Sequence, residues 1–174
     1  DRLFVAVLGH PYGANDERGL FRSTDGGASF QKVLFRGPDT GAIDVVLDPS
    51  NPDTVYAALW EARQAPWENG AFNGPGSGLY KSTDGGTSWR PLRKGLPTYA
   101  DDGLGRIGIT VAPGLPSRLF ATVEAKRDSD GLRPGGHQVG QQDSPRHRVT
   151  RQMVDGHRQP SRPARTRVQP GQGD

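Results

Sequence analysis

An internal repeat constrains the fold of this chain more than any other feature of its sequence. Residues 19–30 (GLFRSTDGGASF) reappear without a gap as residues 78–89 (GLYKSTDGGTSW). Residues 43–58 (IDVVLDPSNPDTVYAA) align with residues 107–122 (IGITVAPGLPSRLFAT), and residues 1–6 match the second half of this segment. The chain therefore enters the repeating unit midway, and we expect it to be a fragment of a longer array.

Each unit is expected to contain four short β-strands. Gly or Pro interrupts the chain at close intervals, and no long window has the apolar spacing of a helix. The expected strands are 3–8, 20–23, 29–35, 43–47, 54–60, 79–82, 88–92, 106–111 and a ninth that ends near residue 124. Four-stranded antiparallel units that repeat in this way are typical of propeller blades. The sequence thus predicts an all-β fold, an incomplete β-propeller of about two to two and a half blades.

With the strands of a blade lettered A to D outward from the propeller axis, the chain reads B, C, D, A, B, C, D, A, B. The C and D strands of both copies are joined by the same tight turn, Ser-Thr-Asp-Gly-Gly-x-Ser followed by an aromatic residue. Its carboxylate can accept backbone N–H groups, its glycines allow positive φ, and its aromatic side chain is expected to lie under the hairpin. The expected structural residues are Ser23, Asp25, Gly27 and Phe30 in the first copy, and Ser82, Asp84, Gly86 and Trp89 in the second.

This pattern resembles the Asp-box, or BNR repeat, of a β-propeller family that includes sialidases, sortilin, xyloglucanases and bacterial secreted proteins. Over about residues 1–125, the chain looks most like the sortilin-type and bacterial secreted members. The resemblance implies that Asp25 and Asp84 are structural carboxylates on an outer hairpin, not a catalytic pair. It also implies a secreted, periplasmic or cell-surface location.

The B–C and D–A loops of antiparallel blades share the end opposite these turns, and a ligand is expected there. The loop at 61–77 is long and combines aromatic with charged residues, and the loop at 94–105 is expected to lie beside it. The candidate ligand residues are Glu61, Arg63, Trp67, Glu68, Phe72, Tyr99, Asp101 and Asp102. Such side chains suit contact with a sugar or a peptide. The alternative is that Trp60 and Trp67 fill the space between blades.

No cofactor or metal is expected. Residues 103–108 (GLGRIG) spell a dinucleotide fingerprint, but a loop precedes them and a strand follows. The turn at 48–53 (DPSNPD) contains possible calcium ligands, yet its two prolines and the missing final Glu favour an ordinary turn. The chain has no Cys, and one of its four His lies in the repeat region, so thiolate and His-rich sites are disfavoured. The longest apolar run, 3–8, is too short for a membrane span.

The chain divides into residues 1–126, the propeller fragment, and residues 127–174, a basic tail. The tail contains no aromatic residue and no Lys, and few of its side chains are apolar, so it is expected to be disordered. Its arginines could bind nucleic acid, but the lack of Lys and of aromatic residues for stacking makes this partner the weaker interpretation. A shifted reading frame from about residue 127 is a further hypothesis for the tail.

The resemblance favours a binding scaffold over an enzyme. The expected partners are a protein, a peptide or a carbohydrate at the B–C and D–A loops, together with the remaining blades of the full-length chain. We expect no catalysis in this fragment. The alternative is a piece of a glycoside hydrolase, sialidase-like or xyloglucanase-like, whose catalytic residues lie in missing blades.

Overall fold

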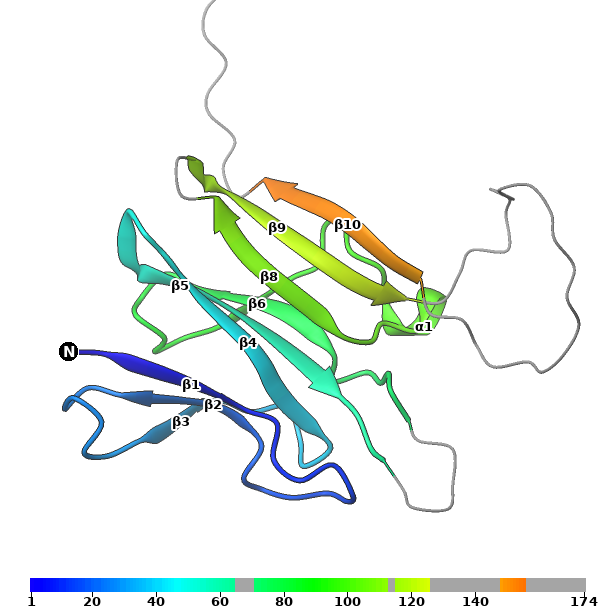
Figure 1. The fold of residues 1–174 in the computed structure, drawn as a ribbon, viewed down its shortest axis with the longest axis horizontal. Coiled ribbons are helices and arrows are strands. Elements are labelled where there is room, and N and C mark those ends of the chain that lie inside the picture. Colours follow the sequence, from blue (N-terminus) through cyan, green and yellow to red (C-terminus); the bar gives the residue numbers. More distant parts are fainter. Residues whose placement is uncertain (65–70, 113–114, 126–147, 156–174) are drawn as a thin grey trace, which may run out of the picture.

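The computed structural model describes residues 1–64, 71–112, 115–125 and 148–155, which form a β-rich fold (Figure 1). Helix in these residues amounts to the single turn α1 (Tyr99–Asp102). The prediction of an all-β chain is therefore confirmed. The described residues contain no helix with the length and hydropathy needed to cross a membrane.

The strands belong to three antiparallel sheets, none of which closes on itself. The first sheet contains β1 (Leu3–Val7), β2 (Gly19–Ser23) and β3 (Gln31–Leu34). The second contains β4 (Thr40–Asp48), β5 (Asn51–Glu61), β6 (Gly78–Ser82) and β7 (Arg90–Leu92). The third contains β8 (Ile107–Ala112), β9 (Leu115–Ala125) and β10 (Arg148–Asp155). Strands that are neighbours along the chain are also neighbours in each sheet, and every strand expected from the repeat is present.

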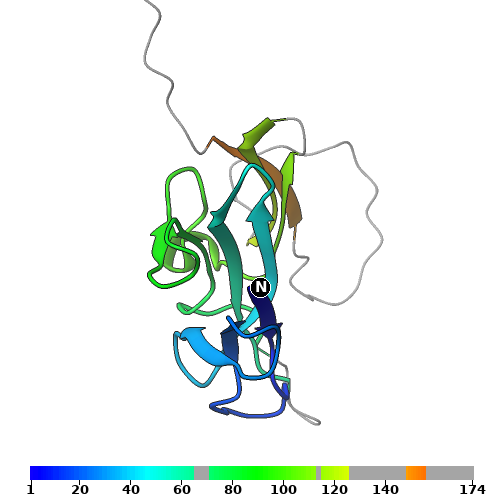
Figure 2. The ribbon, with the colours of Figure 1, turned by 90° about the vertical axis from the view of Figure 1, so that its left-hand side faces the viewer.

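The three sheets stack in order, with the second between the first and the third (Figures 1 and 2). Alternation along β5 explains this arrangement, because successive side chains of a strand point to opposite faces. Ala57 and Leu59 belong to the cluster shared with the first sheet, whereas Tyr56 and Ala58 belong to the cluster shared with the third. All four are buried, so β5 is covered on both faces.

Two apolar clusters hold the stack together. The cluster between the first and second sheets contains Leu20, Leu34, Ala42, Ala57, Leu59 and Tyr80. The cluster between the second and third sheets contains Tyr56, Ala58, Leu79, Leu104, Ile107, Ile109, Leu119, Ala121 and Val123. Burial of apolar side chains between successive sheets is thus the main stabilising contribution to the stack.

A glycine allows the first and second sheets to approach each other closely. A Cβ atom placed on Gly41, in β4, would lie 2.7 Å from the Cα atom of Leu8, which follows β1. Such a contact is shorter than van der Waals separation, and both partners are backbone. The absence of a side chain at residue 41 is therefore a requirement of this packing.

Part of the tail that was expected to be disordered is a strand. β10 pairs with β9 from Arg148 opposite Ala125 to Asp155 opposite Arg118. The free edge of β9 offers backbone groups that an extended segment can bond, whatever its apolar content. The other tail residues, 127–147 and 156–174, lie outside the described residues.

Candidate functional site

The first repeated turn joins β2 to β3 and is closed by the side chains of Ser23 and Asp25. The buried hydroxyl of Ser23 donates to Oδ1 of Asp25 at 2.7 Å and accepts the backbone N–H of Gly27 at 2.8 Å. Oδ1 of Asp25 also accepts the N–H of Ser29 at 3.0 Å, and the Ser29 hydroxyl donates to Oδ2 at 2.6 Å. Both carboxylate oxygens are therefore used within the hairpin.

The second repeated turn, between β6 and β7, has the same geometry. The Ser82 hydroxyl donates to Oδ1 of Asp84 at 2.7 Å and accepts the N–H of Gly86 at 2.8 Å. Ser88 donates its N–H to Oδ1 of Asp84 at 2.9 Å and its hydroxyl to Oδ2 at 2.5 Å. Gly86 has a φ of 84°, a conformation that glycine adopts without steric cost.

These hydrogen bonds also determine the ionisation of the two carboxyl groups. The hydroxyls of Ser23 and Ser29 hold the pKa of Asp25 well below its usual range. Hydrogen bonds from the side chain and backbone of Ser88, followed by Ser82, do the same to the pKa of Asp84. A carboxyl group with such a low pKa is ionised at neutral pH and has no proton to donate, so neither residue suits general acid catalysis.

The aromatic residues of the two turns differ in their environment. Trp89 donates its indole N–H to the carbonyl of Gly86 at 3.2 Å and packs with Phe4 at the cluster between the first and second sheets. Phe30 is instead 44% exposed. The preceding sheet covers Trp89, whereas no described strand covers the corresponding face of the first sheet.

Two arginines, one in β2 and one just before β1, bind residues of the second sheet near its repeated turn. Arg22 donates to the carbonyl of Gly85 at 2.9 Å and to the hydroxyl of Thr87 at 3.0 Å. Arg2 forms an ion pair with Asp53 at 2.6 Å. The second repeated turn is thus fixed by its own side chains and by its neighbour.

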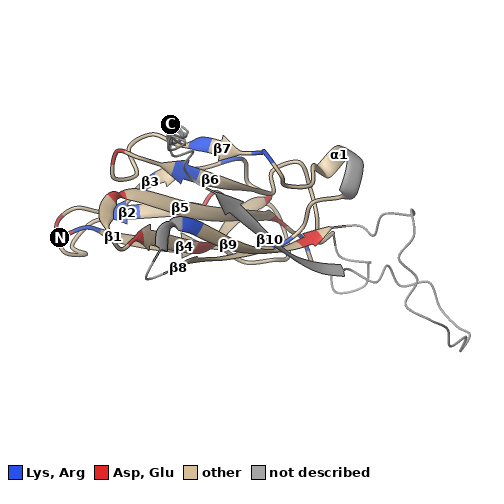
Figure 3. Cartoon of the chain, turned by 90° about the horizontal axis from the view of Figure 1, so that it is seen from above, with Lys and Arg blue, Asp and Glu red and all other residues tan. Residues whose placement is uncertain are grey.

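The loops at the opposite end of the sheets contain the residues expected to bind a ligand. In Figure 3, α1 lies at the end opposite the N-terminus. Trp60 stacks on Phe72 with ring centroids 6.3 Å apart, and its indole N–H donates to the Phe72 carbonyl at 2.7 Å. The guanidinium of Arg106 lies 5.8 Å from the centroid of the Trp60 ring. The loop after β5 and the segment before β8 therefore meet at one place.

The other candidate residues fall into three groups. The carboxylate of Glu61 accepts the N–H of Gly76 at 2.6 Å and is used to shape its own loop, while Arg63 forms a backbone bridge to Ala71. Tyr99 begins α1 and is exposed. The remaining candidates are Asp101 and Asp102, which belong to α1 but whose side chains are not described, and Trp67 and Glu68, which lie outside the described residues.

A buried arginine that the sequence did not predict joins the segments of this end. The side chain of Arg18, in the loop after β1, is fully buried. It donates to the carbonyls of Asp39 at 2.6 Å, Ala62 at 2.8 Å and His10 at 2.9 Å. Burial lowers the pKa of Arg18, and the charge of Asp39 partly opposes this shift. Arg18 is therefore a structural connector between three chain segments.

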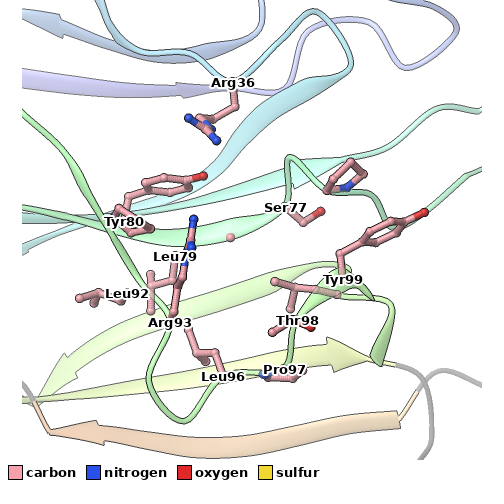
Figure 4. Close-up of a pocket in the computed structure, with 14 residues that line it drawn as sticks. Arg36, Ser77, Leu79, Tyr80, Leu92, Arg93, Leu96, Pro97, Thr98 and Tyr99 are labelled. Carbon is pink, nitrogen blue, oxygen red and sulfur yellow. The ribbon is translucent and has the colours of Figure 1, made fainter. Parts of the chain in front are cut away.

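A cavity of about 220 Å³ opens at the same end, beside β6, β7 and the loop that leads to α1 (Figure 4). Figure 4 shows the side chains of Arg36 and Arg93 directed toward Tyr80 from opposite sides. The hydroxyl-bearing residues around the cavity are Ser77, Tyr80, Thr98 and Tyr99. Arg36 and Arg93 are the charged side chains among the described residues that line it. This arrangement suits a ligand that carries a negative charge.

Neither arginine was among the residues predicted from the sequence, although both occupy similar positions relative to the predicted strands. Arg36 and Arg93 each follow a strand at the outer side of its sheet, at the start of a loop that leads to the next sheet. Tyr99, which was predicted, also lines this cavity.

The comparisons with known proteins add no family. No protein-family model matches the chain. No curated protein matches it.

The described residues contain no group of three or more His, Cys, Asp or Glu side chains placed to hold a metal ion. In the turn between β4 and β5, Oδ1 of Asp48 accepts the N–H and the hydroxyl of Ser50 at 2.9 and 2.7 Å. This carboxylate thus stabilises the turn, which fits the ordinary-turn interpretation of residues 48–53.

Proposed function

We propose that this chain is a ligand-binding module built from Asp-box propeller blades and that its ligand binds at the loop end. The observation that carries the proposal is the cavity where Arg36 and Arg93 converge, at the end opposite the repeated turns. Two features support the Asp-box interpretation: both turns use the same serine–aspartate hydrogen bonds, and successive sheets stack through equivalent strands. The secreted location that the resemblance implies is part of the proposal.

The ligand that fits best is an acidic peptide or an acidic oligosaccharide. A guanidinium pair binds a carboxylate by charge-assisted hydrogen bonds, and Tyr80 and Tyr99 offer ring faces to an apolar group or a sugar. The cavity, about 220 Å³, is smaller than the roughly 300–1,000 Å³ of a site for a drug-sized ligand. It therefore suits one residue of a longer ligand that continues across the surface of the loops.

A binding measurement with paired probes tests this function. Isothermal titration calorimetry at low ionic strength would compare a glutamate hexapeptide and a galacturonic acid trisaccharide with a serine hexapeptide and maltotriose. We expect binding of at least one acidic probe and none of the neutral ones. The double variant Arg36→Gln, Arg93→Gln should weaken that binding at least about tenfold, since charged hydrogen bonds contribute about 1.5–3 kcal/mol each.

Arg90→Gln is the matched control, because Arg90 is an exposed arginine of β7 that is not among the residues lining the cavity. It should leave the affinity for the acidic probe nearly unchanged. Equal losses in the Arg90 variant and the double variant would reduce the effect to net charge and would refute the site. Absence of binding to both acidic probes would refute the proposed ligand class.

A further inference from the structure

The first sheet exposes apolar side chains at positions that the second sheet buries. Residues 1–6 align with residues 53–58, so Leu3 corresponds to Val55 and Val5 to Ala57. Leu3 and Val5 are 43% and 42% exposed, whereas Val55 and Ala57 are fully buried. The difference follows from position in the stack, because the first sheet covers the second and no described strand covers the first.

The aromatic residues of the same face repeat this contrast. Phe21 corresponds to Tyr80 and Phe30 to Trp89, from the repeat of 19–30 in 78–89. Tyr80 is buried in the cluster between the first and second sheets, and Trp89 packs against that cluster. Phe30 is one of the large exposed apolar side chains of the molecule. We name the surface formed by Leu3, Val5, Phe21 and Phe30 the leading face.

The third sheet exposes residues that correspond to those with which the first sheet contacts the second. The segment 107–122 aligns with 43–58, so Phe120 occupies the position of Tyr56 and, in the first sheet, of Phe4. Arg118 likewise occupies the position of Arg2. Phe120 is 41% exposed and Arg118 is exposed, on the side of β9 away from the second sheet. We name the surface around Phe120 and Arg118 the trailing face.

Within the molecule, the equivalents of these residues already form a contact. The Phe4 ring lies 2.6 Å from the place that a Cβ of Gly86 would occupy, and it packs beside Trp89. Arg2 forms its ion pair with Asp53. The internal contact thus joins a Phe and an Arg of one sheet to the turn and the acidic residue of the next.

We propose that the trailing face of one copy of this chain docks on the leading face of a second copy, in the geometry that already joins the first sheet to the second. Phe120 then packs over Gly27 and Phe30 of the second copy, which correspond to Gly86 and Trp89. Arg118 pairs with the carboxylate of Asp1, which corresponds to Asp53. Two different surfaces meet in this contact, so the assembly is head-to-tail and extends beyond a dimer into a ring or an open chain.

Sedimentation velocity of the full 174-residue chain over a range of concentrations tests the proposal. The wild-type chain should form species larger than a dimer as its concentration rises. Val5→Asp removes the leading face and Phe120→Asp removes the trailing face, and each variant alone should sediment as a monomer. Tyr12→Asp is the matched control, because Tyr12 is an exposed aromatic residue in the loop after β1, outside both faces. It should associate like the wild type.

An equimolar mixture of the Val5→Asp and Phe120→Asp variants gives the decisive measurement. Each variant retains one intact face, so the mixture should form a one-to-one dimer and nothing larger. Far-UV circular dichroism tests whether both variants are folded. If one of them is unfolded, Arg118→Glu replaces it as the test, because this substitution leaves the apolar residues intact and should still weaken association. A wild-type chain that remains monomeric, or a mixture of folded variants that does so, would overturn the proposal.

Discussion

At the scale of single residues, the carboxylate of Asp84 links the geometry of a turn to the pH dependence of stability. Its pKa in the folded chain lies below the ordinary 3.8, so the unfolded chain binds more protons at acidic pH. The stabilisation by Asp84 is complete above about pH 4 and is lost as the pH falls through the lowered pKa. We predict that Asp84→Ala lowers the Tm at pH 7 and that this deficit becomes smaller as the pH is lowered from 4 to 2.

Asp16→Ala is the control for this prediction. Asp16 is exposed, and its carboxylate has no hydrogen bond in the described part of the chain, so its removal should change the Tm little at either pH. Thermal unfolding followed by circular dichroism measures all three proteins. A deficit for Asp84→Ala that is as large at pH 2 as at pH 7 would show that the ionised carboxylate is not the stabilising species.

At the scale of elements, the repeat predicted the strands well because each depends on local signals. Apolar runs and Gly- or Pro-bearing turns located the strands from β1 to β9. β4 begins earlier than predicted because residues 40–42 pair with the end of β5, and β5 begins earlier because its pairing with β4 continues to the turn between them. Local signals do not indicate features that depend on a neighbouring strand or sheet. β10 forms on a free strand edge despite its polar composition, and Phe30 is exposed because nothing described covers it.

Contact between strands also explains why residue 41 is a glycine, which the composition of the chain does not indicate. Gly41→Ala would place a Cβ against the backbone of Leu8, which cannot move away as a flexible side chain could. We predict a destabilisation of about 1–3 kcal/mol, the usual cost of forcing extra volume into a packed contact. Gly108→Ala is the control, because a Cβ at this strand glycine would meet nothing within 4 Å. Urea unfolding measures both, and equal stabilities would contradict the close approach of β4 to Leu8.

At the scale of the whole molecule, the sequence indicated the end at which we propose that a ligand binds, but it missed the arginines of the cavity. The predicted meeting of the two loops is present in the contacts of Trp60 with Phe72 and Arg106. Arg36 and Arg93 were missed because they lie far apart in the sequence and converge through the stacking of the first sheet on the second. Spacing along a chain does not reveal such convergence.

Stacking also predicts how stability is distributed over the molecule. β5 and its neighbour β6 have sheets on both sides, whereas β1 and β3 lie in a sheet with one uncovered face. In a stacked array each sheet is stabilised through the neighbours it contacts, so the second sheet should open last. We expect backbone amides of β5 to exchange with deuterium at least about tenfold more slowly than those of β1, measured at concentrations where the chain is monomeric. Equal protection of the two strands would mean that the sheets unfold together and that stacking does not order their stability.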